Sequence, residues 1–308
     1  MKQVRPVLKW AGGKRQLLPA LRPYYPSSFT RYLEPFVGSG AVFLDLYNRS
    51  MLDGRDVRLS DINVDVIGCY RMIRDDVDAV IEELGALQDG YWSRGREHFY
   101  EVRDDRFNPR RRAIHAVENP DEHYTPDVAA MLIYLNRTGY NGLFRVNRRG
   151  LFNVPAGRYD CPRICDADNL RGLSAALGQP GTMLAVRDFD RALGEAGPGD
   201  FVYLDPPYAP VSPTAHFTSY TAARFGQPEQ AQLQRTVIRL AERGANVLLS
   251  NSVAPDIRAL YAENDQARSA GLRARTVEAR RAINSRATSR GAVLEYLITN
   301  IRETGVVN

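Results

Sequence analysis

The chain has 308 residues, of which 44% are hydrophobic, so it is long enough and apolar enough to bury a core. No apolar run reaches the ~20 residues that span a bilayer, and no signal-peptide core follows the N-terminus. We therefore expect a cytoplasmic protein without a membrane partner. The formal net charge of +5 is a weak indication of a nucleic-acid ligand.

The cysteines and the distribution of charge narrow the class of ligand. Cys161 and Cys165 have no second pair nearby, whereas a tetrahedral zinc site needs about four ligands, so we expect free thiols and no metal. Residues 137–163 hold six arginines against Asp160, and residues 268–290 hold seven against Glu278. Two basic blocks suggest a polyanion-binding surface, although each alone is equally consistent with a solvated basic face.

The first predicted unit of the fold is a strand, a glycine turn and a helix. After an extended piece and a Gly12-Gly13 turn, residues 32–34 read as a strand, and Gly38 and Gly40 form a G-x-G turn before a helix that begins at Ala41. A second strand at residues 57–60 ends at Asp61, 21 residues after Gly40, where a carboxylate can bind ribose hydroxyls. The usual third glycine is missing, which favours S-adenosylmethionine over a dinucleotide.

The middle of the chain reads as a helical insertion followed by a basic hairpin. Residues 66–74, 77–87 and 128–136 have helical patterns, and no second G-x-G occurs within residues 64–125. Residues 136–159 are punctuated by glycines, with a predicted hairpin turn at Arg148-Arg-Gly150. Its arginine, asparagine and apolar side chains suit the edges of base pairs. The alternative is a surface hairpin with no partner.

The last third returns to alternating helices and strands. We predict a helix at residues 168–177, strands at 183–186 and 201–204, a long helix at 229–242, a strand at 246–250 and a hairpin over 272–300. The strand at 201–204 runs into Asp205-Pro-Pro-Tyr208. Ligands bind at the carboxyl ends of such strands. The Asp205 carboxylate and the Pro206 carbonyl can accept hydrogen bonds from an exocyclic amine, and the Tyr208 ring can stack on a base. A buried turn with a satisfied aspartate is the alternative.

Seven short motifs occur in one order along the chain, and together they carry a resemblance. They are Lys9-Trp-Ala-Gly-Gly-Lys14, Glu34-Pro-Phe-Val-Gly-Ser-Gly40, Ser60-Asp-Ile-Asn63, Asn136-Arg-Thr-Gly-Tyr-Asn-Gly-Leu143 with its continuation to Arg158, Asp205-Pro-Pro-Tyr208, Phe217-Thr-Ser-Tyr220 and Leu249-Ser-Asn251. In this order they resemble the Dam-type family of DNA adenine N6-methyltransferases, which are class I enzymes dependent on S-adenosylmethionine. Residues 85–125 are the least similar part.

The resemblance implies both a cofactor site and a DNA-reading surface. The cofactor site would be lined by Trp10, Lys14, Phe36, Gly38, Ser39, Gly40, Asp61, Asp188, Phe189 and Asp205. Asp61 would take the ribose hydroxyls, and Asp188 and Phe189 would lie near the cofactor adenine. The DNA-binding residues would be Lys9, Arg137, Tyr140, Asn141, Leu143, Arg145, Asn147, Pro155, Arg158 and Tyr159.

The family reads GATC in duplex DNA, and the resemblance gives these residues roles. Arg145 would read one guanine, and Lys9 with Tyr159 the outer guanine. Leu143 and Pro155 would contact the thymine, while Tyr140 and Asn141 would sit where the target base leaves the stack. Arg158 and Asn147 would contact phosphates. The sequence does not indicate whether a restriction endonuclease accompanies the enzyme, as it would in restriction–modification.

The catalytic residues are expected to be Asp205, Pro206, Pro207 and Tyr208. The enzyme would flip an adenine onto Tyr208, because N6 is unreachable in the helix. Asp205 would accept a hydrogen bond rather than abstract a proton, since a solvated carboxylate with a pKa of ~4 is too weak a base. Cytosine N4, RNA or protein glutamine methylation and a catalytically silent DNA-binding protein are the alternatives. Asp205 in place of asparagine disfavours the glutamine enzymes.

The predicted fold class is α/β. We expect a Rossmann-like mixed sheet with helices on both faces and a C-terminal antiparallel β-hairpin, in a protein that acts as a monomer. Residues 1–63 and 166–308 would form the S-adenosylmethionine-binding catalytic domain. Residues 64–165 would form an inserted, mainly helical target (DNA) recognition domain with its own β-hairpin.

Overall fold

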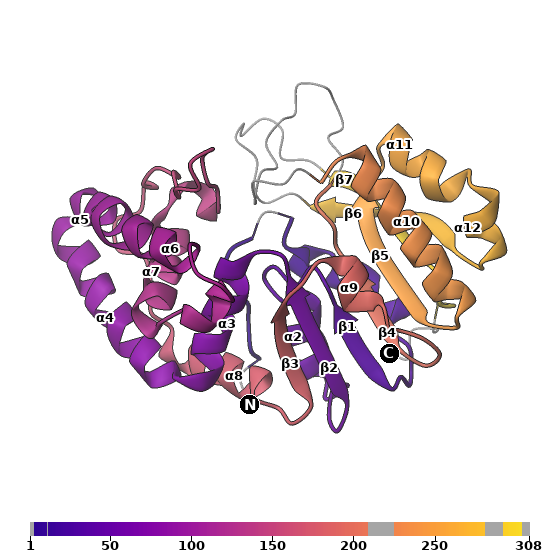
Figure 1. Cartoon of the computed structure of the whole chain (residues 1–308), viewed down its shortest axis with the longest axis horizontal. Helices are drawn as coiled ribbons and strands as arrows, with labels where there is room; N and C mark the ends of the chain where they lie inside the picture. The colour runs from indigo at the N-terminus through magenta and orange to yellow at the C-terminus, as the bar shows by residue number, and fades with distance from the viewer. Residues whose placement is uncertain (1–2, 11, 209–224, 281–291, 304–308) are drawn as a thin grey trace.

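A computed structural model describes residues 3–10, 12–208, 225–280 and 292–303, and these residues form a seven-stranded mixed sheet (Figure 1). The strand order is β3-β2-β1-β4-β5-β7-β6. The strands are β1 (Arg31–Glu34), β2 (Asp56–Asp61), β3 (Thr182–Val186), β4 (Phe201–Leu204), β5 (Asn246–Ser252), β6 (Arg273–Arg280) and β7 (Ala292–Thr299). The predicted fold class is confirmed, including the C-terminal hairpin.

The direction of the strands decides where a ligand can bind. Strands β1 to β5 pair in parallel, whereas β7 is antiparallel to both β5 and β6. The chain runs outward from β1 through β2 to β3 and then returns to β4 on the other side of β1. The direction in which successive strands are added to the sheet therefore reverses between β1 and β4. In open α/β sheets the crevice outside the carboxyl ends of the strands at this point binds the ligand.

Side chains that alternate along each strand divide the hydrophobic core into two layers. Tyr32 belongs to one cluster of buried side chains and Leu33 to the other. Strand β4 repeats this alternation, with Phe201 and Tyr203 in the first cluster and Val202 and Leu204 in the second. Because successive side chains of a strand point to opposite faces, the sheet buries both faces under helices.

The helices complete the two layers. They are α1 (Leu18–Leu21), α2 (Ala41–Asn48), α3 (Val64–Asp75), α4 (Val77–Arg94), α5 (Arg96–Glu101), α6 (Asn108–Ile114), α7 (Pro126–Thr138), α8 (Ala167–Leu177), α9 (Phe189–Leu193), α10 (Gln227–Glu242), α11 (Pro255–Ile257) and α12 (Asp265–Ser269). Short turns of 3-10 helix are η1 (Lys14–Gln16), η2 (Arg22–Tyr24), η4 (Pro120–His123) and η5 (Tyr140–Gly142), and π-helical turns are η3 (Val102–Phe107) and η6 (Arg258–Ala262).

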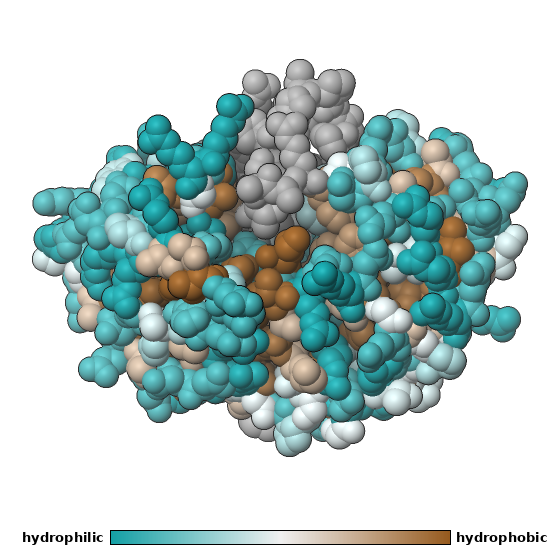
Figure 2. Space-filling view, in the orientation of Figure 1, coloured by the Kyte–Doolittle hydropathy of each residue, from teal (hydrophilic) through white to brown (hydrophobic). Residues whose placement is uncertain are grey.

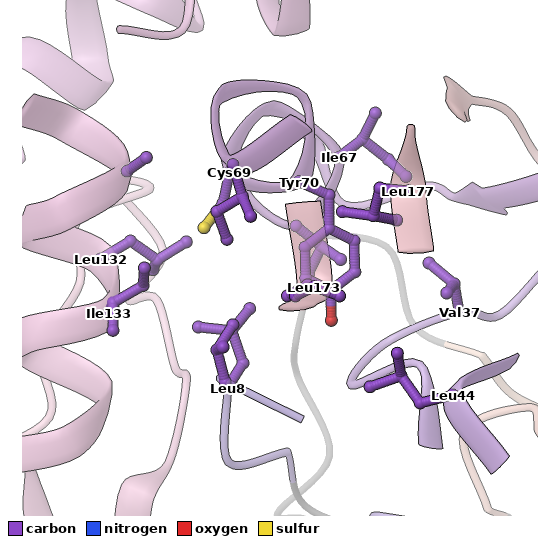
Figure 3. Packing of buried hydrophobic residues seen from close by; sticks show 14 of the residues in the cluster. Leu8, Val37, Leu44, Ile67, Cys69, Tyr70, Leu132, Ile133, Leu173 and Leu177 are labelled. Carbon is purple, nitrogen blue, oxygen red and sulfur yellow. The ribbon is translucent and has the colours of Figure 1, made fainter. Parts of the chain in front are cut away.

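Helices α3 to α7 lie between β2 and α8 in the chain and gather at one side of the sheet, in purple and magenta in Figure 1. Helix α3 contacts β2 and β3 as well as α7 and α8, so it joins these helices to the sheet. Figure 3 shows the cluster that results, with Cys69 and Tyr70 of α3, Leu132 of α7 and Leu173 of α8. The helical character predicted for this stretch is confirmed.

The surface on the side of the molecule drawn in Figure 1 is not uniform in hydropathy. Figure 2 shows hydrophobic side chains gathered near the middle of the view, with hydrophilic side chains on both flanks. Among the described residues, no helix is long and apolar enough to cross a membrane. The predicted loop at 284–291, and residues 209–224 with Phe217 and Tyr220, lie outside the described residues.

Candidate active site and DNA interface

The glycine turn after β1 brings backbone close to the carboxyl ends of the strands. Gly38 and Gly40 have φ values of 44° and 64°, in the left-handed region that favours glycine. The Gly38 N–H donates to Asp61 Oδ2 at 3.0 Å, and the Tyr70 hydroxyl donates to the Gly38 carbonyl at 2.7 Å. A Cβ on Gly38 would lie 2.9 Å from Cδ1 of Trp10. The turn, Asp61 and Trp10 are therefore fixed against one another.

Asp61 lies at the end of β2, where the sequence places a carboxylate for ribose hydroxyls. Its Oδ1 accepts from the Asn63 N–H at 2.9 Å. Burial raises the pKa of Asp61 to about 6, although the backbone donors from Asn63 and Gly38 oppose the shift. A carboxylate that is short of water gains from additional donors. The hydroxyls of a nucleoside fit this position.

Aromatic rings from three parts of the chain pack together beside the glycine turn. The rings of Phe36 and Phe189 are stacked with their centroids 5.7 Å apart. The ring of Phe225 meets Phe36 edge-on at 5.7 Å. Asp188 caps α9 by accepting from the Arg191 N–H at 3.0 Å. The sequence prediction named Phe36, Asp188 and Phe189 but not Phe225, which follows the loop whose structure is not described.

The Asp205 carboxylate at the end of β4 is part of a charged cluster. Lys14 Nζ lies 2.9 Å from Asp205 Oδ1 and 3.8 Å from Glu295 Oε2. The same ammonium lies 4.4 Å from the centre of the Tyr208 ring, and the Tyr208 hydroxyl donates to Glu295 Oε2 at 2.5 Å. The structure thus brings together Lys14, Asp205 and Tyr208, which the sequence placed at one site.

One property of Asp205 differs from the prediction. The sequence analysis assumed a solvated carboxylate, but the side chain is only 20% exposed. Burial raises the pKa of Asp205, while the Lys14 ammonium and the Ser250 hydroxyl oppose the shift. The prediction of a solvated carboxylate is therefore wrong, because Asp205 is largely buried beside Lys14 and Ser250 of β5. With Lys14 at 2.9 Å, the geometry still suits an acceptor of hydrogen bonds.

The turn that follows β4 is held by side chains of neighbouring elements. The Gln230 amide of α10 donates to the Pro207 carbonyl at 2.9 Å, and Asn251 donates to Gln230 Oε1 at 3.1 Å. The Ser250 hydroxyl donates to Asp205 Oδ1 at 3.1 Å. Ser250 and Asn251 belong to a motif that the sequence analysis quoted without giving them a role. Ser250 contacts the Asp205 carboxylate directly and Asn251 acts through Gln230, so both help to hold the turn in place.

Glu295 and Glu34 are carboxyl groups that the predicted site did not include. Glu295 is a single charged residue within the apolar run of β7, and that signal was available in the sequence. Glu34 ends β1 and is 2% exposed. The Tyr32 hydroxyl donates to Glu34 Oε2 at 2.8 Å. Burial raises the pKa of Glu34 to about 8, and the charge of Asp205 adds to the shift.

The basic hairpin lies between residues 139 and 157 and has little ladder of its own. Two isolated antiparallel bridges, Gly139 with Ala156 and Val146 with Phe152, join its two sides. The turn at its tip contains Gly150 with a φ of 73°, as the sequence predicts. The carboxamide oxygen of Asn147 accepts from the Arg149 and Leu151 N–H groups at 2.9 and 3.1 Å. Asn147 therefore shapes the turn.

Lys9 lies at the base of this hairpin, next to residues predicted to read DNA. Its ammonium is 5.1 Å from the centre of the Tyr159 ring. The Asn136 side chain accepts from the Lys9 N–H at 2.7 Å and donates to the Lys9 and Gly142 carbonyls at 2.8 and 3.0 Å. Burial lowers the pKa of Lys9, and the charge of Arg137 adds to the shift. The structure thus joins Lys9 to the hairpin across a long interval of sequence.

The other predicted DNA-binding residues follow the same surface. Arg145 Nε donates to Asn153 Oδ1 at 2.8 Å across the hairpin. Tyr140, Pro155 and Arg158 are exposed, whereas Asn141, Leu143 and Arg137 are half-buried. Most of these side chains belong to the hairpin, with Lys9 at its base, and together they form a candidate interface.

Comparison with known proteins identifies the family of this chain. The model of the D12 class of N6 adenine-specific DNA methyltransferases matches residues 10–283. The chain belongs to this family. Its activity is therefore DNA adenine N6 methylation. The alternatives that the sequence left open were methylation of cytosine N4, RNA or protein glutamine, and a catalytically silent DNA-binding protein.

Three relatives match along almost their whole length. "Type II methyltransferase M.MjaIII" of Methanocaldococcus jannaschii is 38% identical over 97% of this chain and 99% of its own. "Type II methyltransferase M1.LlaDCHI" of Lactococcus lactis subsp. cremoris is 35% identical, with coverage of 96% and 95%. The "DNA adenine methylase" of Escherichia coli K12 is 33% identical, with coverage of 100% and 99%. A solved rRNA methyltransferase from Streptomyces viridochromogenes is 15% identical with a TM-score of 0.31 over 96% of this chain and 86% of that one, which is too low to support an argument.

Proposed function

We propose that this methyltransferase takes its methyl group from S-adenosylmethionine bound between Trp10, the Gly38–Gly40 turn and Asp61. Left-handed glycines allow close approach of a ligand to the backbone, and the Asp61 carboxylate is positioned to accept from ribose hydroxyls. The stacked rings of Phe36 and Phe189 offer an apolar wall for an adenine ring. The family's chemistry supports this donor.

We propose that the target adenine leaves the duplex and stacks on Tyr208. N6 of a paired adenine faces its partner base, so the reaction needs an extruded base. Asp205 and the Pro206 carbonyl would accept the two N6–H bonds, which localises the nitrogen lone pair for in-line attack on the methyl group. S-adenosylmethionine supplies an electrophilic methyl group, and the chain's own residues supply orientation and electrostatic stabilisation. The observation that carries this proposal is the meeting of Lys14, Asp205 and Tyr208 at the carboxyl end of β4.

The catalytic proposal has a direct test. Asp205→Ala should abolish methyl transfer while S-adenosylmethionine binding, measured by calorimetry, is retained. Asp205→Asn removes the charge with little change of shape and should reduce kcat by about 10²–10³-fold, the usual loss when one electrostatic contact to the reacting group is removed. Substantial turnover by Asp205→Ala would contradict the assignment of this carboxylate.

We propose that residues 64–165 form the target recognition domain and that its hairpin reads GATC. The arginine, asparagine and apolar side chains of the hairpin match the major-groove pattern of these bases. The pairing of Lys9 with Tyr159 supports a shared contact to the outer guanine. Labelled methyl groups should enter duplexes that contain GATC and not those with GATG or CATC. Equal labelling of all three would refute the specificity and leave the chemistry intact.

A further inference from the structure

A row of side chains from the helical segment holds the second side of the hairpin. The Asn108 side chain accepts from the Phe152 N–H at 2.8 Å and donates to the Phe152 carbonyl at 3.0 Å. Arg103 Nη1 donates to the Val154 carbonyl at 3.0 Å, and Arg111 Nη1 donates to the Gly150 carbonyl. The contacted backbone positions are two residues apart, which is the repeat of an extended strand. Three side chains therefore take the place of a neighbouring strand.

The π-helical turn η3 explains how one helix presents all three side chains. In an α-helix, residues five apart point about 140° away from each other. Here the Asn108 N–H donates to the Arg103 carbonyl, an i to i+5 bond that places Asn108 one turn above Arg103. Arg111 follows three residues later, on the same face of α6. The extra residue of the π turn thus aligns Arg103 with Asn108 and Arg111.

The row is anchored to α3, which begins three residues after Asp61 at the end of β2. Arg111 Nε and Nη2 bind the Asp65 carboxylate, with the shortest contact at 2.7 Å. Asp65 is fully buried in the first turn of α3, four residues after Asp61, and also accepts from the Tyr124 hydroxyl at 3.2 Å. A buried, bidentate pair of this kind has one geometry. The hairpin is therefore held in a fixed relation to the end of β2.

We propose that Arg103, Asn108 and Arg111 are positioning residues that set the base discrimination of the enzyme by fixing the hairpin. Arg145 is bonded to Asn153, which lies between the two backbone positions that Asn108 and Arg103 hold. A shift of residues 150–154 therefore moves the guanidinium of Arg145. This inference rests on the proposed function, because it assumes that the hairpin reads DNA. It gives residues 102–111 a role that the sequence did not indicate.

The decisive variant is Asn108→Ala, because it removes two hydrogen bonds from the hairpin without touching the buried Asp65 pair. Asn300 offers a matched control, since it also accepts from one backbone N–H and donates to one carbonyl, of Val247 and Ala245, both at 2.8 Å. Arg103→Met is a second variant, which removes the bond to the Val154 carbonyl together with the pair that Arg103 makes with Asp104, and keeps the aliphatic stem. The wild-type target is first identified by sequencing DNA that the enzyme has methylated. Then kcat/KM is measured on that duplex and on duplexes with single base changes.

We expect Asn108→Ala to lower the ratio of cognate to near-cognate kcat/KM at least tenfold, with S-adenosylmethionine affinity unchanged. Arg103→Met should lower it by a smaller factor, and Asn300→Ala should leave it unchanged. Hydrogen exchange at the Phe152 amide should accelerate in Asn108→Ala. If Arg145→Ala lowers the ratio but Asn108→Ala and Arg103→Met do not, the inference is overturned while the proposed function stands. If Arg145→Ala also leaves the ratio unchanged, the proposed reading role of the hairpin is what fails.

Discussion

At the carboxyl edge of the sheet, parallel strands β1, β2 and β4 fix Glu34, Asp61 and Asp205 through a backbone ladder that continues to their neighbours. In the hairpin of residues 139–157, two isolated bridges and a few backbone hydrogen bonds join the two sides, and side chains of η3, α6 and α7 add support. A site that performs chemistry on one nitrogen atom needs groups held within a fraction of an ångström. A surface that recognises DNA bases needs a defined orientation, and its residues differ between proteins that recognise different sequences.

The largest effect that would test this comparison concerns Glu34, a neutral carboxyl group beneath the sheet edge. Burial raises its pKa from the ordinary value of 4.5 to about 8, so between these pH values the folded state binds a proton that the unfolded state releases. The free energy of unfolding should therefore fall by about 4 kcal/mol as pH rises from about 4.5 to about 8. Glu34→Gln should lose most of this slope in urea unfolding. Equal slopes in both proteins would show that Glu34 does not stabilise the edge.

A somewhat smaller effect is expected at the base of the hairpin, where Gly142 has a φ of 63° and a Cβ would lie 2.4 Å from Cδ of Lys9. Gly142→Ala should cost about 2 kcal/mol of folding free energy, from backbone strain and from displacement of Lys9. Gly54→Ala is the control, since Gly54 has a φ of 69° and nothing within 4 Å. Gly54→Ala should show the cost of backbone strain alone. It should leave DNA affinity unchanged, whereas Gly142→Ala should weaken DNA binding. Equal losses in both variants would mean that the contact with Lys9 contributes nothing.

The smallest effect concerns Asp61, and it separates cofactor binding from DNA reading. Because the pKa of Asp61 is raised from 3.8 to about 6, its carboxylate becomes protonated as pH falls through about 6. If only the carboxylate accepts from the ribose, the Kd for S-adenosylmethionine should rise about tenfold per pH unit below that value. Asp61→Asn should bind weakly with no such dependence. A flat wild-type profile between pH 5 and pH 8 in calorimetry would remove Asp61 from the cofactor site.

Local sequence patterns determined the elements and most of the residues of the candidate site at the carboxyl edge of the sheet. Short apolar runs bounded by turn residues identify β1 and β4, paired glycines identify the turn after β1, and Asp205-Pro-Pro-Tyr208 identifies a strand that ends in a rigid turn. Gly150 likewise identifies the tip of the hairpin. These features are readable because each depends on the conformational preference of a few adjacent residues.

Only the tertiary structure decided which distant residues complete the two regions. Glu295 reaches Tyr208 because β7 pairs with β5 in the antiparallel direction, and strand neighbours of this kind leave no short-range pattern. Burial raises the pKa of Asp205, and the charge of Glu295 on β7 adds to the shift, against the expectation of a solvated carboxylate. Asn108 contacts Phe152 because the π turn changes the direction in which this part of the helix points its side chains. The sequence of a helix does not show which distant backbone groups its side chains will bind. Burial and side-chain-to-backbone bonds are properties of the assembled fold, so the sequence could indicate the groups but not their environment.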